Sequence, residues 1–300
     1  MRLNLSSEIV LNKIPEEYYN PKTAVERSEI TRCEKIHTDI FPKIEEGATY
    51  IARAIEAEIK FKNDQGKLCV LGLGTGNSLT PVYEELIRLH KENGLSFARV
   101  AVFNAYEYFP LNEGNPHSSI SQLRERFLDH VNIAPENVFT LDGTVPQEMV
   151  NSSCKQYEQR IVDMGGIDVM LLGRMGNIAT NEPGSVLTSG SRLILIDAVS
   201  REEMTLSFGS KEAVPPCSIT MGIATILSAR KIFLTAWGED KADIIQRAVE
   251  EKVTKPIRMQ MWLSTCLLHR VLRALFIPGW LLLASGQISL CARLWCGCVS

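Results

Sequence analysis

The sequence predicts an α/β fold, a Rossmann-like and mostly parallel sheet with helices on both faces. Short apolar runs alternate with helical patterns along most of the chain. Two of these runs, residues 68–73 and 167–172, are apolar at almost every position and end in glycine-containing loops. Continuous apolar runs are typical of parallel strands that are buried on both faces, and we expect right-handed crossovers between them.

The elements follow in order from these patterns. A stripe of apolar residues at helical spacing predicts the first helix of the domain. The members of this stripe are Ala48, Ile51, Ala52, Ile55 and Ile59. Further helices are expected at 80–92, 119–131, 147–164, 221–229 and 240–250. Strands are expected at 68–73, 99–104, 137–141, 167–172, 192–197 and 231–236.

The loop after the strand at 68–73 has the composition of an anion-binding turn. Small residues before a helix N-terminus leave backbone N–H groups unpaired and let a phosphate approach closely. The loop lacks the lysine of a P-loop and the third glycine of a dinucleotide fingerprint, so a purely steric turn remains an alternative. This segment, the first loop, consists of Gly74, Thr75, Gly76, Asn77 and Ser78.

A second loop follows the strand expected at 167–172. Gly173 and Gly176 free the backbone just beyond the carboxyl end of that strand, where open α/β sheets bind ligands. Glu182 then stands beside Pro183, and a carboxylate held in one place suits a general acid or base. An exposed glutamate in a turn explains the same residues equally well.

Several segments, taken in order, resemble the glucosamine-6-phosphate deaminase (isomerase) family, whose fold is called NagB-like. They lie at 71–78, 95–108, 128–131, 176–185 and 218–225. The resemblance implies a cytoplasmic enzyme that opens the ring of a hexosamine phosphate, isomerises aldose to ketose and releases ammonia. It implies that neither a metal nor an organic cofactor takes part. It also implies that the partner is a small molecule, a hexosamine phosphate, and that the protein acts in amino-sugar metabolism such as N-acetylglucosamine catabolism.

The chain departs from this family at its acid and base positions. Where the family has its base, this chain has Tyr106, and a phenol, which ordinarily titrates near pH ~10, is a poor base. Where the family has a ring-opening histidine, Asn177 cannot shuttle a proton at neutral pH. Glu107 and Glu182 remain as carboxylates. We therefore expect a divergent member, a pseudoenzyme, with catalytic candidates Glu182, Glu107, Tyr106 and Asn177.

The resemblance also assigns ligand-binding positions. Thr220 is expected to assist the first loop in holding phosphate. Ser185 and Arg192 match an allosteric phosphate site that some family members have. A single arginine at the start of a strand is as readily a solvated charge.

Composition limits the partners. The formal net charge of −3 argues against nucleic acid. No apolar segment follows Met1, so no secretory signal is expected. A membrane is not expected as a partner either. Cys33, Cys69, Cys154 and Cys217 are scattered without metal-site spacing and are expected to be reduced thiols. A homo-oligomer is compatible with these observations, which do not decide it.

Three segments are predicted: an N-terminal extension (1–43), a deaminase-like domain (44–256) and an anomalous tail (257–300). The tail contains no Asp, Glu, Lys, Asn or Tyr, whereas about a quarter of the residues in soluble domains are charged. Its apolar residues show no sustained helical or strand period, so we expect an out-of-frame or disordered segment that leaves the sheet without its closing strand.

Three hypotheses therefore remain from the sequence. The chain is an amino-sugar-phosphate deaminase, a non-catalytic sugar-phosphate-binding domain, or a decayed fragment of a longer protein. A sugar-phosphate lactonase is a further option that rests on fold analogy alone.

Overall fold

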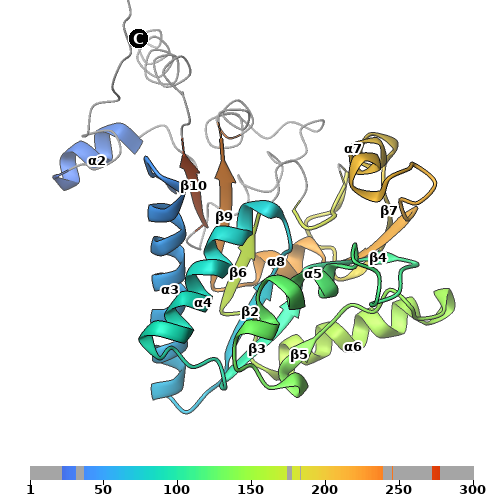
Figure 1. Ribbon diagram of the computed structural model, residues 1–300, viewed down its shortest axis with the longest axis horizontal. Helices are drawn as coiled ribbons and strands as arrows, with labels where there is room; N and C mark the ends of the chain where they lie inside the picture. The colour runs from blue at the N-terminus through green and yellow to red at the C-terminus, as the bar shows by residue number, and fades with distance from the viewer. Residues whose placement is uncertain are drawn as a thin grey trace, which may run out of the picture.

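The computed structural model describes residues 22–31, 37–173, 178–182, 184–238, 245 and 272–277. Its centre is a seven-stranded sheet with the order β1-β10-β9-β6-β2-β3-β5, in which each neighbouring pair is parallel (Figure 1). The predicted Rossmann-like α/β fold is confirmed. The strands are β1 (His37–Ile40), β2 (Cys69–Leu73), β3 (Val100–Asn104), β5 (Val138–Phe139), β6 (Val169–Leu172), β9 (Lys231–Trp237) and β10 (Leu272–Ile277).

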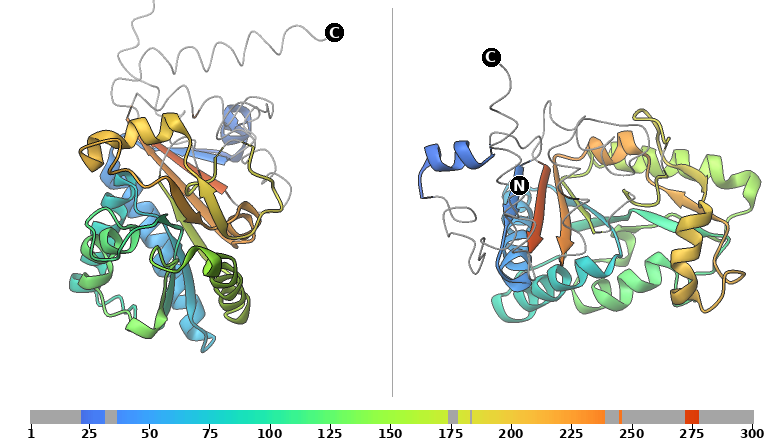
Figure 2. Two further views of the ribbon diagram at one scale, coloured as in Figure 1. Left: turned by 90° about the vertical axis from the view of Figure 1, so that its right-hand side faces the viewer. Right: turned by 90° about the horizontal axis from the view of Figure 1, so that it is seen from above.

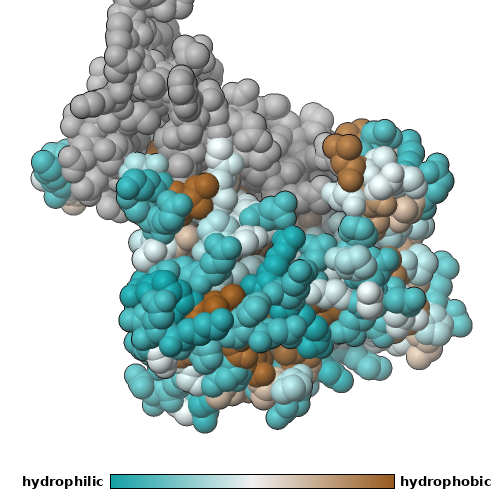
Figure 3. Space-filling model, in the orientation of Figure 1, coloured by the Kyte–Doolittle hydropathy of each residue, from teal (hydrophilic) through white to brown (hydrophobic). Residues whose placement is uncertain are grey.

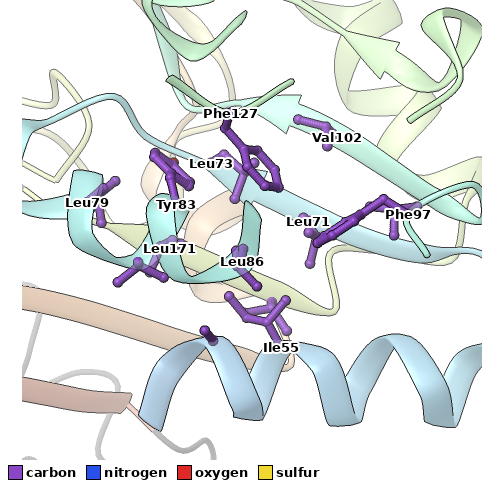
Figure 4. Close-up of a cluster of buried hydrophobic side chains, with 14 of the residues drawn as sticks. Ile55, Leu71, Leu73, Leu79, Tyr83, Leu86, Phe97, Val102, Phe127 and Leu171 are labelled. Carbon is purple, nitrogen blue, oxygen red and sulfur yellow. The ribbon is translucent and has the colours of Figure 1, made fainter. Parts of the chain in front are cut away.

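Helices cover both faces of this sheet (Figure 2). On one face lie α3 (Ile44–Asp64), α4 (Thr80–Asn93) and α5 (Ser119–Arg126), and on the other α6 (Val150–Asp163) and α8 (Ile223–Leu227). Side chains alternate along a strand, so Leu71 and Leu73 face the first group while Val70 faces the second. The predicted stripe of α3 is buried at all five positions. Figure 4 shows the core beneath α3 and α4.

A second, antiparallel sheet with the order β4-β8-β7 was not predicted. It consists of β4 (Tyr106–Phe109), β8 (Cys217–Thr220) and β7 (Arg192–Leu195). The strand expected at 192–197 belongs to this sheet and not to the parallel one, which corrects that expectation. Helix α7 (Ala198–Phe208) follows β7, and its N-cap residue is Asp197, whose side chain accepts from the amides of Val199 and Ser200.

Some boundaries differ from the sequence patterns. The helix expected at 119–131 ends at Arg126, because Phe127 leaves the helical conformation with φ −147°, and a short 3-10 turn, Leu128–His130, follows. A 3-10 turn, Asn77–Leu79, leads into α4, and Leu79 is the N-cap residue of that helix. Apart from Ile245, the helix expected at 240–250 lies outside the described residues.

Two segments outside the predicted 44–256 domain contribute strands to the large sheet. Residues 37–40 form β1, preceded by α2 (Ala24–Thr31), and residues 272–277 form β10 between β1 and β9. The expectation that the tail supplies no closing strand is therefore wrong for residues 272–277. The other tail residues lie outside the described part of the chain.

The surface seen in Figure 3 is mostly hydrophilic over α3 and α4, with a hydrophobic patch over α7. Leu206 of α7 is 94% exposed and Leu195 at the end of β7 is 76% exposed. Within the described residues, no helix combines the length and the apolar character needed to cross a membrane.

Candidate functional site

The first loop is fixed at the carboxyl edge of the large sheet by the ends of β6 and β9. Ser78 Oγ donates to the Gly173 carbonyl at 2.6 Å, and Trp237 Nε1 donates to the Ser78 carbonyl at 2.6 Å. A Cβ on Gly173 would lie 2.4 Å from Leu79 Cγ, so only glycine permits this approach. The first loop and the start of the second are therefore packed together.

Three hydroxyl groups meet above the first loop. Thr75 Oγ1 lies 2.9 Å from the Tyr106 hydroxyl and 3.3 Å from Ser119 Oγ. These residues come from the first loop, the start of β4 and the first turn of α5. The position at which the resemblance implies a base therefore holds a phenol hydroxyl within hydrogen-bond reach of the predicted phosphate loop.

Glu107 lies beside Tyr106 in the sequence but points into the protein, where it is only 2% exposed. Its Oε1 accepts from the amides of Tyr108 and Ser119, at 2.9 and 2.8 Å. Its Oε2 accepts from the Ser118 hydroxyl at 2.8 Å and the Ile120 amide at 3.1 Å. Burial raises the pKa of this carboxyl, and the four hydrogen bonds partly offset the rise. Glu107 thus anchors the N-terminus of α5 to β4.

The small sheet brings three predicted site residues into one row across its strands. Tyr106 pairs with Thr220, and Thr220 pairs with Arg192. Directly paired residues of an antiparallel sheet share one face. Thr220 is fully buried, its hydroxyl donates to the Met221 carbonyl at 3.1 Å, and it accepts from the Thr180 amide at 3.3 Å.

Arg192 is held by neutral groups. Its guanidinium donates to Asn181 Oδ1 at 2.9 Å, to Ser185 Oγ at 2.8 Å and to Ser189 Oγ at 3.2 Å. Burial lowers the pKa of this guanidinium. The structure therefore brings together Ser185 and Arg192, the pair that the resemblance assigns to an allosteric site.

The remaining candidates are only partly placed. Glu182 is partly buried next to the buried Asn181, whereas Asn177 lies outside the described residues. Over the described ranges, no three His, Cys, Asp or Glu side chains are grouped closely enough to hold a metal ion.

Sequence reasoning missed two polar residues that hold the site. Arg126, on α5, donates to the Thr75 carbonyl at 2.8 Å. Glu158, on α6, accepts from the Ser191 amide at 2.7 Å and from the Thr225 hydroxyl at 2.6 Å, and so fixes the chain next to Arg192. The only available signal for Arg126 was its spacing of seven residues from Ser119, which places both on one side of a helix.

Comparison with known proteins agrees with this geometry. The family model described as glucosamine-6-phosphate isomerases/6-phosphogluconolactonase matches residues 42–264. A glucosamine-6-phosphate deaminase-like protein of Bacteroides thetaiotaomicron is 51% identical over 259 residues, which cover 86% of this chain and 39% of the relative. The chain thus spans well under half the length of that protein. The glucosamine-6-phosphate deaminase of Clostridium acetobutylicum is 34% identical over 215 residues, covering 71% of this chain and 87% of the enzyme.

Solved structures give the same result. A monomeric glucosamine-6-phosphate deaminase superimposes with a TM-score of 0.72 at 29% identity, covering 81% of this chain and 98% of that one. A 6-phosphogluconolactonase from Thermotoga maritima, with a TM-score of 0.59 and 14% identity, shares the fold. The chain therefore belongs to the glucosamine-6-phosphate isomerase/6-phosphogluconolactonase family, with a NagB-like fold.

Proposed function

We propose that this protein binds a hexosamine phosphate at the carboxyl edge of its large sheet and releases ammonia from it very slowly or not at all. It would act in the cytoplasm, in amino-sugar phosphate metabolism, without a cofactor. The family and the names of its relatives support the ligand class. The Tyr106 hydroxyl hydrogen-bonded to Thr75, at the position of the expected base, is the observation that carries the loss of turnover.

The first loop is suited to the phosphate group. Within the described residues, the amides of Thr75, Gly76, Asn77 and Ser78 donate to no described acceptor, and they lie in the turn that leads into α4. Unpaired amides at the start of a helix attract an anion through their own dipoles and that of the helix. The loop is also held from behind by β6 and β9, so it needs little reorganisation to bind.

The proton-transfer groups are poorly suited to the reaction. Moving a proton between neighbouring sugar carbons requires a positioned base that titrates near the working pH. The Tyr106 phenol is hydrogen-bonded to Thr75. Glu107 is buried, and its carboxylate accepts four hydrogen bonds. Asn177 cannot transfer a proton. Glu182, the other predicted carboxylate, is partly buried beside Asn181 and remains a candidate acid or base.

Ammonia release from glucosamine 6-phosphate tests the catalytic part of this proposal. The wild-type rate should be near background, because a positioned general acid or base contributes typically about 10²–10⁴-fold. The double variant Tyr106→Asp/Asn177→His should raise the rate. The control double variant Tyr106→Asn/Asn177→Gln makes similar changes in side-chain size but introduces no titrating group, and it should not raise the rate. A wild-type turnover typical of deaminases would overturn the loss of catalysis.

Calorimetry with glucosamine 6-phosphate tests the binding part. Gly76→Glu should abolish the heat of binding, because a carboxylate in the first loop repels the phosphate. The backbone of Gly76, with φ −62°, accepts a side chain. Gly114→Glu is the matched control, because a Cβ there meets nothing within 4 Å. If both variants bind like the wild type, the ligand lies elsewhere. Absence of a cooperative unfolding transition would favour the third hypothesis, a decayed fragment.

A further inference from the structure

The carbonyl groups of two consecutive first-loop residues are each held by a side chain. The Tyr83 hydroxyl donates to the Gly74 carbonyl at 2.5 Å, and Arg126 donates to the Thr75 carbonyl at 2.8 Å. Tyr83 lies in the core of Figure 4 among Leu79 and Phe127, and its burial raises the pKa of the phenol far above the usual range. It therefore remains a donor at every pH of interest.

These two bonds fix the direction of the amides that follow. In a trans peptide the C=O and the next N–H point in opposite directions. The Thr75–Gly76 bond is trans, because the one cis bond among the described residues is Phe109–Pro110. The Gly76 N–H therefore points away from Arg126, and by the same geometry the Thr75 N–H points away from Tyr83. Neither amide has a described acceptor.

Arg126 reaches the loop from two helical turns beyond Ser119, which contacts the Thr75 hydroxyl. Long helical side chains lean toward the helix N-terminus, so both residues of α5 can contact Thr75. Arg126 is partly buried, and no described carboxylate forms an ion pair with it. Arg124 on the same helix differs, because it pairs with Glu113 at 3.1 Å. The charge of Arg126 thus stands uncompensated behind the first loop.

We infer that Arg126 is a positioning residue for the phosphate end of the ligand. It fixes the Thr75–Gly76 peptide with its N–H directed away from α5, polarises that N–H by binding the carbonyl of the same peptide, and adds a positive charge behind it. A hydrogen bond from a charged donor strengthens the donor capacity of the amide to which it is linked. The inference deepens the proposed function and depends on it.

The test compares Arg126→Met, Arg126→Gln and Arg126→Lys in the full chain, with Arg124→Gln as the matched control. The two probes are glucosamine 6-phosphate and inorganic phosphate, measured by calorimetry at low and high salt. Arg126→Met should lower the affinity for both probes by the same factor, about ten-fold or more, since charge-assisted hydrogen bonds are about twice as strong as neutral ones. Arg126→Lys should recover most of the affinity. Arg126→Gln should recover less and should flatten the salt dependence. Arg124→Gln should bind like the wild type.

The outcomes separate the two claims. If the wild type binds neither probe, the proposed function fails and this inference fails with it. If the wild type binds and Arg126→Met binds within two-fold of it, the inference alone is wrong. If all three variants lose affinity equally and unfold at a lower temperature, Arg126 has only a structural role and the inference is wrong. Should Arg126→Met fail to fold, the comparison of the Lys and Gln variants decides.

Discussion

The two edges of the large sheet differ in how the charged side chains near them are paired. At the amino-terminal edge, Asp168 is completely buried, and its carboxylate is bound by Lys62, by Arg230 and by the Val70 amide. Glu58 and Lys231 form a further pair there. Near the carboxyl edge, Arg126 of α5 and Arg192 of the small sheet contact neutral groups only, among the bonds of the described residues. The compensated charges at the amino-terminal edge serve stability, whereas the positive charges near the carboxyl edge, which have no described carboxylate partner, lie where we propose that the anionic ligand binds.

The largest expected effect is at the amino-terminal edge. Asp168→Ala leaves two cations beside a buried site without their carboxylate, and breaking a buried pair in this way typically costs about 3–5 kcal/mol. Urea unfolding should show this loss. The control is Glu202→Ala, which breaks the exposed pair between Glu202 and Lys211 and should cost under about 1 kcal/mol. Equal losses of unfolding free energy for the two substitutions would mean that the buried contacts of Asp168 stabilise the protein no more than an exposed ion pair does.

An intermediate effect is expected for Glu107→Gln, at the junction between β4 and α5. The amide group replaces one acceptor oxygen by a donor that faces N–H groups, which should cost about 1–3 kcal/mol. Because burial raises the folded-state pKa of Glu107, its ionisation opposes folding. The stability associated with this residue is complete below its unfolded pKa of about 4.3 and is lost as pH rises through the raised folded pKa.

The measurement for Glu107 is urea unfolding of the wild type and Glu107→Gln at several pH values between 4 and 8. The difference in unfolding free energy should narrow as pH rises. A difference that widens with pH would mean that the four hydrogen bonds outweigh burial and that Glu107 favours its charged form in the folded protein.

The smallest effect is expected at the carboxyl edge. Arg192→Gln removes a half-buried charge that has no described carboxylate partner, so no opposite charge is left behind. The unfolding free energy should therefore change by less than about 1 kcal/mol, since the surrounding hydroxyl and amide groups can bond to one another or to water. A loss as large as that of Asp168→Ala would show that Arg192 is a structural residue and not part of an anion site.

Much of the large sheet could be predicted because its pattern is local. The α3 stripe and the runs that became β2, β3, β6 and β9 contain their own periodicity, and burial follows from it. The small sheet could not be predicted, because β4 has four residues and pairs with β8, more than a hundred positions away. The β10 strand carries no such pattern either. Its place depends on the edges that β1 and β9 offer, and these edges are not visible in the tail's own sequence.

The candidate site likewise contains some features that local sequence signals predict and others that only the fold brings together. The first loop could be predicted as a candidate phosphate-binding loop from its glycines and from the helix after it, because both are local signals. The role of Glu107 depended on the amides at the start of α5, which only the fold brings to it. Arg126 looks like any helical arginine until the Thr75 carbonyl is placed beside it. The acid and base positions came from the resemblance, and their catalytic roles stay predictions.

The position of β10 has a consequence for the order of folding. Among the described residues, β1 is an edge strand whose neighbour in the sheet is β10, so its pairing has to wait until residues 272–277 are available. Until residues 272–277 are synthesised, the edge of β9 that β10 covers stays open to other chains. Pairing between strands so far apart in the sequence closes a long loop and is slow. The β1-β10-β9 side of the sheet therefore forms only after residues 272–277 have been synthesised, and until then the open edge of β9 is exposed to mispairing.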